Sequence, residues 1–143
     1  MHVVAIDAGA LDHMAIASFG INYKVVEPGE KASLQRLLGQ FAIVHFKMHA
    51  DTARKMMDIK VHMIVNDTNL SAKDSAEAML PYLDILADDG LVVMTVKCVD
   101  RNVEKHIGQA KDALRGALDI VSVRSLPSNR QEVTIFARKK AHE

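Results

Sequence analysis

The stretch LVVMTVK, Leu91–Lys97, is almost entirely apolar and ends in a lysine. A continuous run of aliphatic and β-branched residues is typical of a strand buried on both faces in the middle of a parallel sheet. The preceding residues Asp88, Asp89 and Gly90 have the composition of a turn. We therefore assign Leu91–Lys97 to the centre of the predicted sheet.

Helical patterns flank this strand on both sides. Upstream, apolar residues recur at helical spacing over residues 71–86, and Ser71 begins this helix with a capping-box-like pattern. Pro81 interrupts the pattern and should kink or split the helix. Downstream, the same spacing predicts a second helix over residues 102–118, with Asp100 as a candidate cap. A strand between two helices of this kind is the pattern of an α/β protein.

The chain closes with two strand patterns, DIVSVRSL and EVTIFARK, joined by a short polar link that permits antiparallel pairing. Alternation along the second strand places Val133 and Ile135 on one face and Glu132 and Phe136 on the other. Upstream, HVVAID, NYKVVEP, FAIVHFKM and VHMIVND are further predicted strands, and the last of these is expected to be buried. We therefore predict one α/β domain over residues 1–143, with a mostly parallel sheet and an antiparallel last strand.

Composition narrows the class of protein. The 143 residues include 49% hydrophobic and 25% charged residues, which is ordinary for a globular domain. Because 18 basic residues balance 18 acidic ones, the chain as a whole does not attract nucleic acid, and the basic residues 138–140 are expected to form a solvated tail. We expect no membrane span and no signal peptide, and the single cysteine, Cys98, fits a reducing, cytoplasmic setting.

Seven histidines raise the question of a metal site. His45 and His49 are four residues apart, but His45 lies on a predicted strand, where that spacing separates the rings by more than one metal-ligand span. No cysteine cluster or HExxH motif accompanies them. We therefore expect structural or surface histidines, no metal, and a packing role for Cys98.

Polar residues stand at the ends of the predicted strands, where open α/β sheets bind ligands. Asp7 ends the first strand, and its carboxylate could accept hydrogen bonds from both hydroxyls of a ribose. Asp67 and Lys97 end two others, and Glu132 begins the antiparallel last strand at the same edge of the sheet. We therefore expect Asp67, Lys97 and Glu132 to converge, with the two carboxylates fixing the position and the pKa of the lysine.

The segments MIVNDTNLSAKDSAEAMLPYLDILADDGLVVMTVKCV and VRSLPSNRQEVTIFARKK resemble the C-terminal two thirds of the FtsJ-type (RrmJ-like) S-adenosylmethionine-dependent RNA ribose 2′-O-methyltransferases. In that family an acid follows the fourth strand, a glycine-containing turn precedes a strand ending in lysine, and a glutamate follows a Ser/Arg-rich turn. Asp67, Gly90, Lys97, the SNR segment and Glu132 hold those places here. The resemblance implies a Rossmann-like methyltransferase fold and the last three members of a Lys-Asp-Lys-Glu catalytic set.

The resemblance also implies roles for individual residues. Asp67 and Glu132 would position Lys97, and Lys97 would handle the proton of an RNA 2′-hydroxyl as it attacks the methyl group. Within the S-adenosyl-L-methionine site, Asp7 would hold the ribose and Asp51 would lie near the adenine. The methyl-transfer side would be lined by Asn66, Thr68 and Asn69. The implied substrate is RNA, in particular ribosomal RNA.

The chain begins at the family's second strand, so the first strand, its glycine-rich cofactor loop and the first catalytic lysine are absent. It is therefore expected to be truncated at the N-terminus, either as a fragment of a longer enzyme or as a shortened relative. An upstream segment or a second copy of the chain could complete the sheet. A non-catalytic module that binds RNA or a protein stays open as an alternative, and whether this chain alone is an enzyme is not decided. A generic nucleotide-binding Rossmann domain is disfavoured because no GxGxxG motif occurs.

Overall fold

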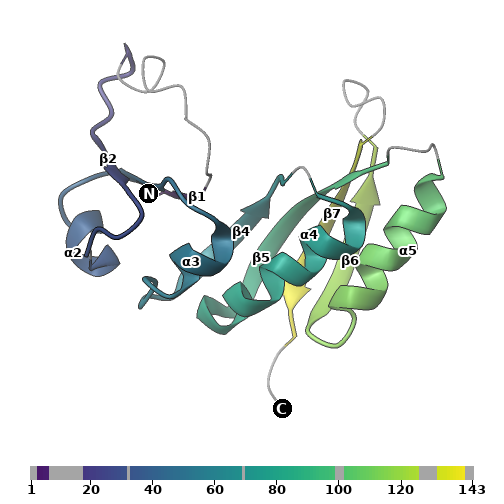
Figure 1. Cartoon of the computed structure of the whole chain (residues 1–143). Helices are drawn as coiled ribbons and strands as arrows, with labels where there is room; N and C mark the ends of the chain where they lie inside the picture. Colours follow the sequence, from purple (N-terminus) through teal and green to yellow (C-terminus); the bar gives the residue numbers. More distant parts are fainter. Residues whose placement is uncertain are drawn as a thin grey trace. The chain divides into compact units, whose positions relative to one another are not determined.

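The computed structural model describes residues 3–6, 18–31, 33–68, 70–98, 102–125 and 132–140. The chain divides into two compact units, Met1–Ile59 and Lys60–Glu143, and each contains a sheet of its own (Figure 1). The α/β class predicted from the sequence is confirmed in both units, because strands and helices alternate along the chain. The assignment of all 143 residues to one domain stays a prediction.

The first unit holds a three-stranded parallel sheet in the order β1-β3-β2. Its strands are β1 (Val3–Ile6), β2 (Tyr23–Val26) and β3 (Ile43–Phe46), and its helices are α2 (Leu34–Leu38) and α3 (Ala50–Arg54). The central strand β3 supplies the fully buried Val44, His45 and Phe46. Ser33 caps the start of α2 and Gly39 its end. Burial of apolar residues on β3 thus holds this unit together.

The second unit holds a four-stranded sheet in the order β4-β5-β7-β6. Its strands are β4 (Val61–Asn66), β5 (Leu86–Lys97), β6 (Leu118–Arg124) and β7 (Glu132–Lys139). The pairing of β4 with β5 is parallel, whereas β7 is antiparallel to both β5 and β6. The predicted central strand and the predicted antiparallel last strand are therefore confirmed, and β4 lies at an edge of the sheet.

The helices of the second unit are α4 (Ala72–Met79), the 3-10 helix η1 (Leu80–Ile85) and α5 (Val103–Leu114). The predicted cap at Ser71 and the break at Pro81 are confirmed, because Ser71 Oγ accepts a hydrogen bond at 3.2 Å and η1 begins just before Pro81. The predicted extension of α5 to residue 118 is wrong, since β6 starts there, and Asn102 is the cap. Among the described residues, no helix is long and apolar enough to cross a membrane.

Within the described part of the second unit, helices cover one face of the four-stranded sheet. Buried side chains of β5 and β7 pack against α4 and α5, with Val92, Met94 and Ile135 fully buried in the core between them. In the second unit of Figure 1, α4 and α5 lie side by side in front of the strands. On the opposite face, Met63 is 57% exposed and Val65 is 66% exposed, so the prediction of a buried strand at VHMIVND is wrong for this face. We call this opposite surface the open face.

The turn predicted at residues 88–90 is also wrong. These residues belong to β5 as an irregular stretch, where Val61 pairs with Leu86 and Met63 pairs with Leu91. The step of two residues on β4 matches a step of five on β5, so the extra residues bulge out of the ladder. Asp89 takes a φ of 61°, a left-handed value that a short polar side chain tolerates.

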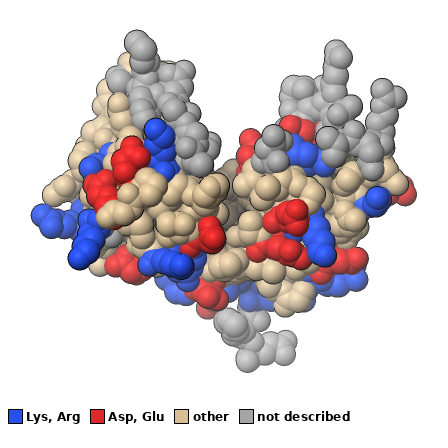
Figure 2. Space-filling model, viewed as in Figure 1, with Lys and Arg blue, Asp and Glu red and all other residues tan. Residues whose placement is uncertain are grey.

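Of the basic residues 138–140, Arg138 and Lys140 are exposed as the sequence predicts, but the side chains are bound to backbone carbonyls rather than free in solvent. The ammonium of Lys139 donates to the carbonyl oxygens of Leu83 and Leu86 at 2.8 and 2.7 Å. That of Lys140 donates to the carbonyl of Arg115 at 2.8 Å. Both lysines therefore satisfy carbonyl groups at the C-terminal ends of helices, where positive charge is favoured. On the side of the molecule seen in Figure 2, acidic and basic side chains are interspersed.

Candidate active site

Three charged side chains meet at the carboxyl end of β5. The Nζ atom of Lys97 donates to Glu132 Oε1 at 2.7 Å and to Asp67 Oδ1 at 2.9 Å. The convergence predicted from the sequence is therefore confirmed. We refer to Asp67, Lys97 and Glu132 together as the charged triad.

Strand register explains why the triad forms. Lys97, the last residue of β5, pairs directly with Glu132, the first residue of the antiparallel β7. Asp67 immediately follows β4, which runs parallel to β5 on its other side. The carboxyl ends of β4 and β5 and the amino end of β7 thus share one edge of the sheet. Alternation places Lys97 and Glu132 on the open face, away from the helices.

The triad keeps Lys97 protonated. The hydrogen bond to Glu132 is the main cause that raises the pKa of Lys97 above the ordinary lysine value, and Asp67 adds to it by hydrogen bonding and charge. Partial burial acts in the opposite direction but is outweighed. At neutral pH the side chain of Lys97 is therefore a fixed ammonium and is 22% exposed. The carboxylate of Asp67 on one side is 67% exposed, and that of Glu132 on the other is 32% exposed. Because an ammonium has three N–H donors, one donor is left for a further oxygen.

A buried hydrogen-bond network holds the loop that carries Asp67. Asn66 donates through Nδ2 to the carbonyl of Ser75 at 3.0 Å, and its Oδ1 accepts from Ser75 Oγ and from the backbone N–H of Thr68, both at 3.3 Å. Thr68 Oγ1 and Ser75 Oγ lie 2.7 Å apart. The network ties the end of β4 to the first turns of α4 and so fixes the backbone on either side of Asp67.

The sequence did not single out Ser75, which is 1% exposed on α4. A polar residue beside the apolar positions 72, 76 and 79 is the signal that could have indicated it. The side chains of Asn66 and Thr68 turn toward Ser75, so their polar atoms are engaged within this network. Their predicted place on the methyl-transfer side stays a prediction, as does that of Asn69, which lies outside the described residues.

The residues predicted to hold the nucleoside part of the cofactor belong to the first unit. Asp51 is exposed in the first turn of α3, and its carboxylate accepts a hydrogen bond from the N–H of Thr52 at 3.1 Å. Its second oxygen leaves it able to accept from an amine such as that of adenine. Asp7 follows β1 but lies outside the described residues, so its role stays a prediction.

Cys98 points away from the triad, as the alternation of β5 predicts. It is 1% exposed within the core of the second unit, and its thiol contacts the carbonyl of Val96 at 3.8 Å. The packing role expected for this residue fits that position. His45 lies fully buried on β3, in keeping with a structural histidine.

Comparison with known proteins places the fold. No protein-family model matches the chain, and no curated protein matches it. Solved structures do match. The fibrillarin pre-rRNA processing protein of Methanococcus jannaschii has 17% identity and a TM-score of 0.66, with 99% of this chain and 67% of that one covered. The chain has the fold of an S-adenosylmethionine-dependent methyltransferase.

Two further structures show how widely this fold is shared. Fibrillarin in complex with Nop5p has 22% identity and a TM-score of 0.63 over 97% of this chain and 72% of that one. The N-methyltransferase NodS of Bradyrhizobium japonicum has 13% identity and a TM-score of 0.55 over 98% and 86% of the two chains. A second NodS structure contains S-adenosyl-L-homocysteine. The methyltransferase-like fold predicted from the sequence is therefore confirmed.

Proposed function

We propose that the chain is the catalytic portion of an S-adenosylmethionine-dependent methyltransferase of the FtsJ-like type that methylates ribose 2′-hydroxyls in RNA, with ribosomal RNA as the first substrate to test. The charged triad is the observation that carries this proposal. A lysine held between two carboxylates at the carboxyl edge of a sheet can bind the oxygen of an alcohol and relay its proton to a carboxylate. The likeness to fibrillarin, a pre-rRNA processing protein, supports RNA as the substrate class.

The triad supplies the proton transfer that the reaction needs. A bound S-adenosylmethionine would provide an electrophilic methyl group on its sulfonium. The remaining N–H of Lys97 would donate to the 2′-oxygen and fix it for attack. During methyl transfer, Lys97 would pass one of its protons to Asp67 or Glu132 and rotate about its Cε–Nζ bond, so that the lone pair set free accepts the hydroxyl proton. The short contacts of 2.9 and 2.7 Å suit such a relay.

The cofactor contacts of this proposal are the ones that the family resemblance implies. The fixed loop after β4 would face the methyl group, and Asp51 and Asp7 would bind the adenine and the ribose. The proposed location of the protein is the cytoplasm. Because β4 is an edge strand of its sheet, an upstream segment or a second copy of the chain could pair with it and extend the sheet.

The first experiment is a calorimetric titration of S-adenosylmethionine into the chain and its Asp7→Ala variant, followed by incubation with tritium-labelled cofactor and an unmodified ribosomal RNA transcript. We expect micromolar binding that is weakened in the variant, and label in 2′-O-methylated nucleosides after complete digestion of the RNA. Label in base-methylated nucleosides would reject ribose as the target. Binding of RNA without binding of the cofactor would show instead a non-catalytic module.

A further inference from the structure

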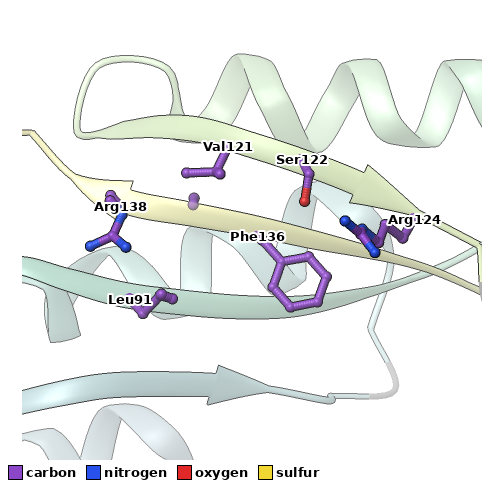
Figure 3. Close-up of a pocket in the computed structure, with 7 residues that line it drawn as sticks. Leu91, Val121, Ser122, Arg124, Phe136 and Arg138 are labelled. Carbon is purple, nitrogen blue, oxygen red and sulfur yellow. The ribbon is translucent and has the colours of Figure 1, made fainter.

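The open face of the four-stranded sheet contains a hollow of about 330 Å³, within the range of small-ligand sites (Figure 3). Its lining includes Phe136 and Arg138 of β7, Arg124 and Val121 of β6, and Leu91 of β5. No part of the charged triad lines it, so the hollow is separate from the candidate active site. The methyl transfer proposed above does not involve the residues that line this hollow.

Phe136 occupies the middle of this hollow. It pairs with Val93 of β5 on one side and with Ser122 of β6 on the other, so its ring stands on β7 between these two strands. Arg138 follows it by two residues on β7, and Arg124 pairs with Thr134, two residues before it. Each step of two residues is about 7 Å, so one arginine lies on either side of the ring along the strand, as Figure 3 shows.

Both arginines are available to an anion. Each is exposed, and among the described residues neither forms an ion pair with a carboxylate. Arg138 gives one N–H to the carbonyl of Asp89 at 3.2 Å, which orients the guanidinium and leaves its other donors. A guanidinium presents paired donors to a phosphate, and an aromatic ring presents a stacking surface to a base.

We propose that the open face binds single-stranded RNA, with a base stacked on Phe136 and the flanking phosphates on Arg124 and Arg138. This inference rests on the proposed function and adds a substrate-binding site to it. Lys97 and Glu132 lie on the same face, four residues along the strands from Phe136, which is about 13 Å. An RNA strand lying along β7 would therefore run from the arginine-flanked ring to the charged triad.

Charge favours RNA over a polypeptide as the occupant. Lys139 and Lys140 are bound to carbonyl oxygens, so on β7 the exposed positive charge is that of Arg138, joined across the hollow by Arg124. The side of the molecule seen in Figure 2 has charges of both signs interspersed. Two cations on either side of one aromatic ring match alternating phosphates and bases, which every single strand presents.

The test measures binding of a fluorescein-labelled, twelve-nucleotide single-stranded RNA by anisotropy, without S-adenosylmethionine, over a range of salt concentrations. The variants are Phe136→Leu, which keeps an apolar side chain, and Arg124→Gln with Arg138→Gln. Met63→Gln on the same face is the matched control, since Met63 is exposed but stands on the edge strand β4. A twelve-unit abasic strand separates stacking from charge.

We expect Phe136→Leu to weaken RNA binding by about 5- to 150-fold and to leave binding of the abasic strand unchanged. Each arginine removed should lower the slope of log affinity against log salt by about 0.7. Unchanged affinity and slope in these variants would overturn the inference. So would self-association that Phe136→Leu and Met63→Gln both abolish, because the open face would then be a protein interface. Binding that behaves as expected in a chain without methyl transfer would contradict the proposed function alone.

Discussion

Replacing Lys97 by methionine tests whether the charged triad is maintained for stability or for chemistry. The substitution keeps an unbranched apolar stem and removes the ammonium. The carboxylates it leaves behind are those of Asp67, 67% exposed, and Glu132, 32% exposed, and both remain in contact with water. Breaking a fully buried ion pair costs about 3–5 kcal/mol because a charge is stranded, but solvated pairs contribute about 0–1 kcal/mol. We therefore expect Lys97→Met to lower the stability of the four-stranded sheet by about 1 kcal/mol.

Hydrogen exchange at the amide of Met94 is the appropriate assay, because Met94 is fully buried on β5 and reports on this sheet alone. A loss of about 1 kcal/mol corresponds to about a fivefold loss of protection. Lys105→Met, which removes an exposed lysine from α5, is the matched control and should change protection by less than twofold by the same arithmetic. A loss of protection of a hundredfold or more at Lys97→Met would refute the reasoning, since the triad would then be a structural element of the fold.

Four further predictions concern polar and charged side chains of the second unit. Asn66→Ala should destabilise the sheet by about 2–3 kcal/mol, because three hydrogen bonds are lost, two of them buried, and the protection of the Met94 amide should fall accordingly. Glu132→Gln should lower the pKa of Lys97, measured by NMR of the lysine side chain, because Glu132 is the main cause that raises it. Folding raises the pKa of Lys97, so the stability that Lys97 adds should be complete below about pH 10.4, the ordinary lysine value. This stability should be lost as the pH rises through the higher pKa of the folded state. Chemical denaturation of the wild type and of Lys97→Met at increasing pH would show the loss. Lys139→Met should cost about 1–2 kcal/mol in chemical denaturation, since two carbonyl groups lose a charged donor; an unchanged midpoint would show that water replaces it.

Local patterns and sheet geometry were enough to predict the charged triad. The apolar run before Lys97 indicated a central strand, and the carboxyl ends of parallel strands share an edge with the start of an antiparallel one. Glu132 could therefore be placed beside Lys97 before any coordinates were known. The break at Pro81 followed equally from local chemistry, because proline lacks the N–H that a continuous helix requires.

Features that depend on distant contacts could not be predicted in this way. An apolar strand does not show which of its faces lacks a helix, so the exposure of Met63 and Val65 was missed. The basic residues at the end of the chain looked like a solvated tail, because nothing in their neighbourhood indicates the carbonyl groups that Lys139 and Lys140 reach 25 to 56 residues away. The division of the strands into two sheets likewise depends on pairing between segments far apart in the chain.

The most direct test of the account is the single-turnover rate at which the chain forms 2′-O-methylated nucleosides in RNA, compared between the wild type, Lys97→Met and the control Lys105→Met. If the triad handles the proton of the attacking hydroxyl, Lys97→Met should lower this rate by about 10²–10⁴-fold and leave the affinity for S-adenosylmethionine unchanged. The control should keep the wild-type rate. Equal rates in the wild type and Lys97→Met, at equal occupancy by cofactor and RNA, would contradict the catalytic role of the triad.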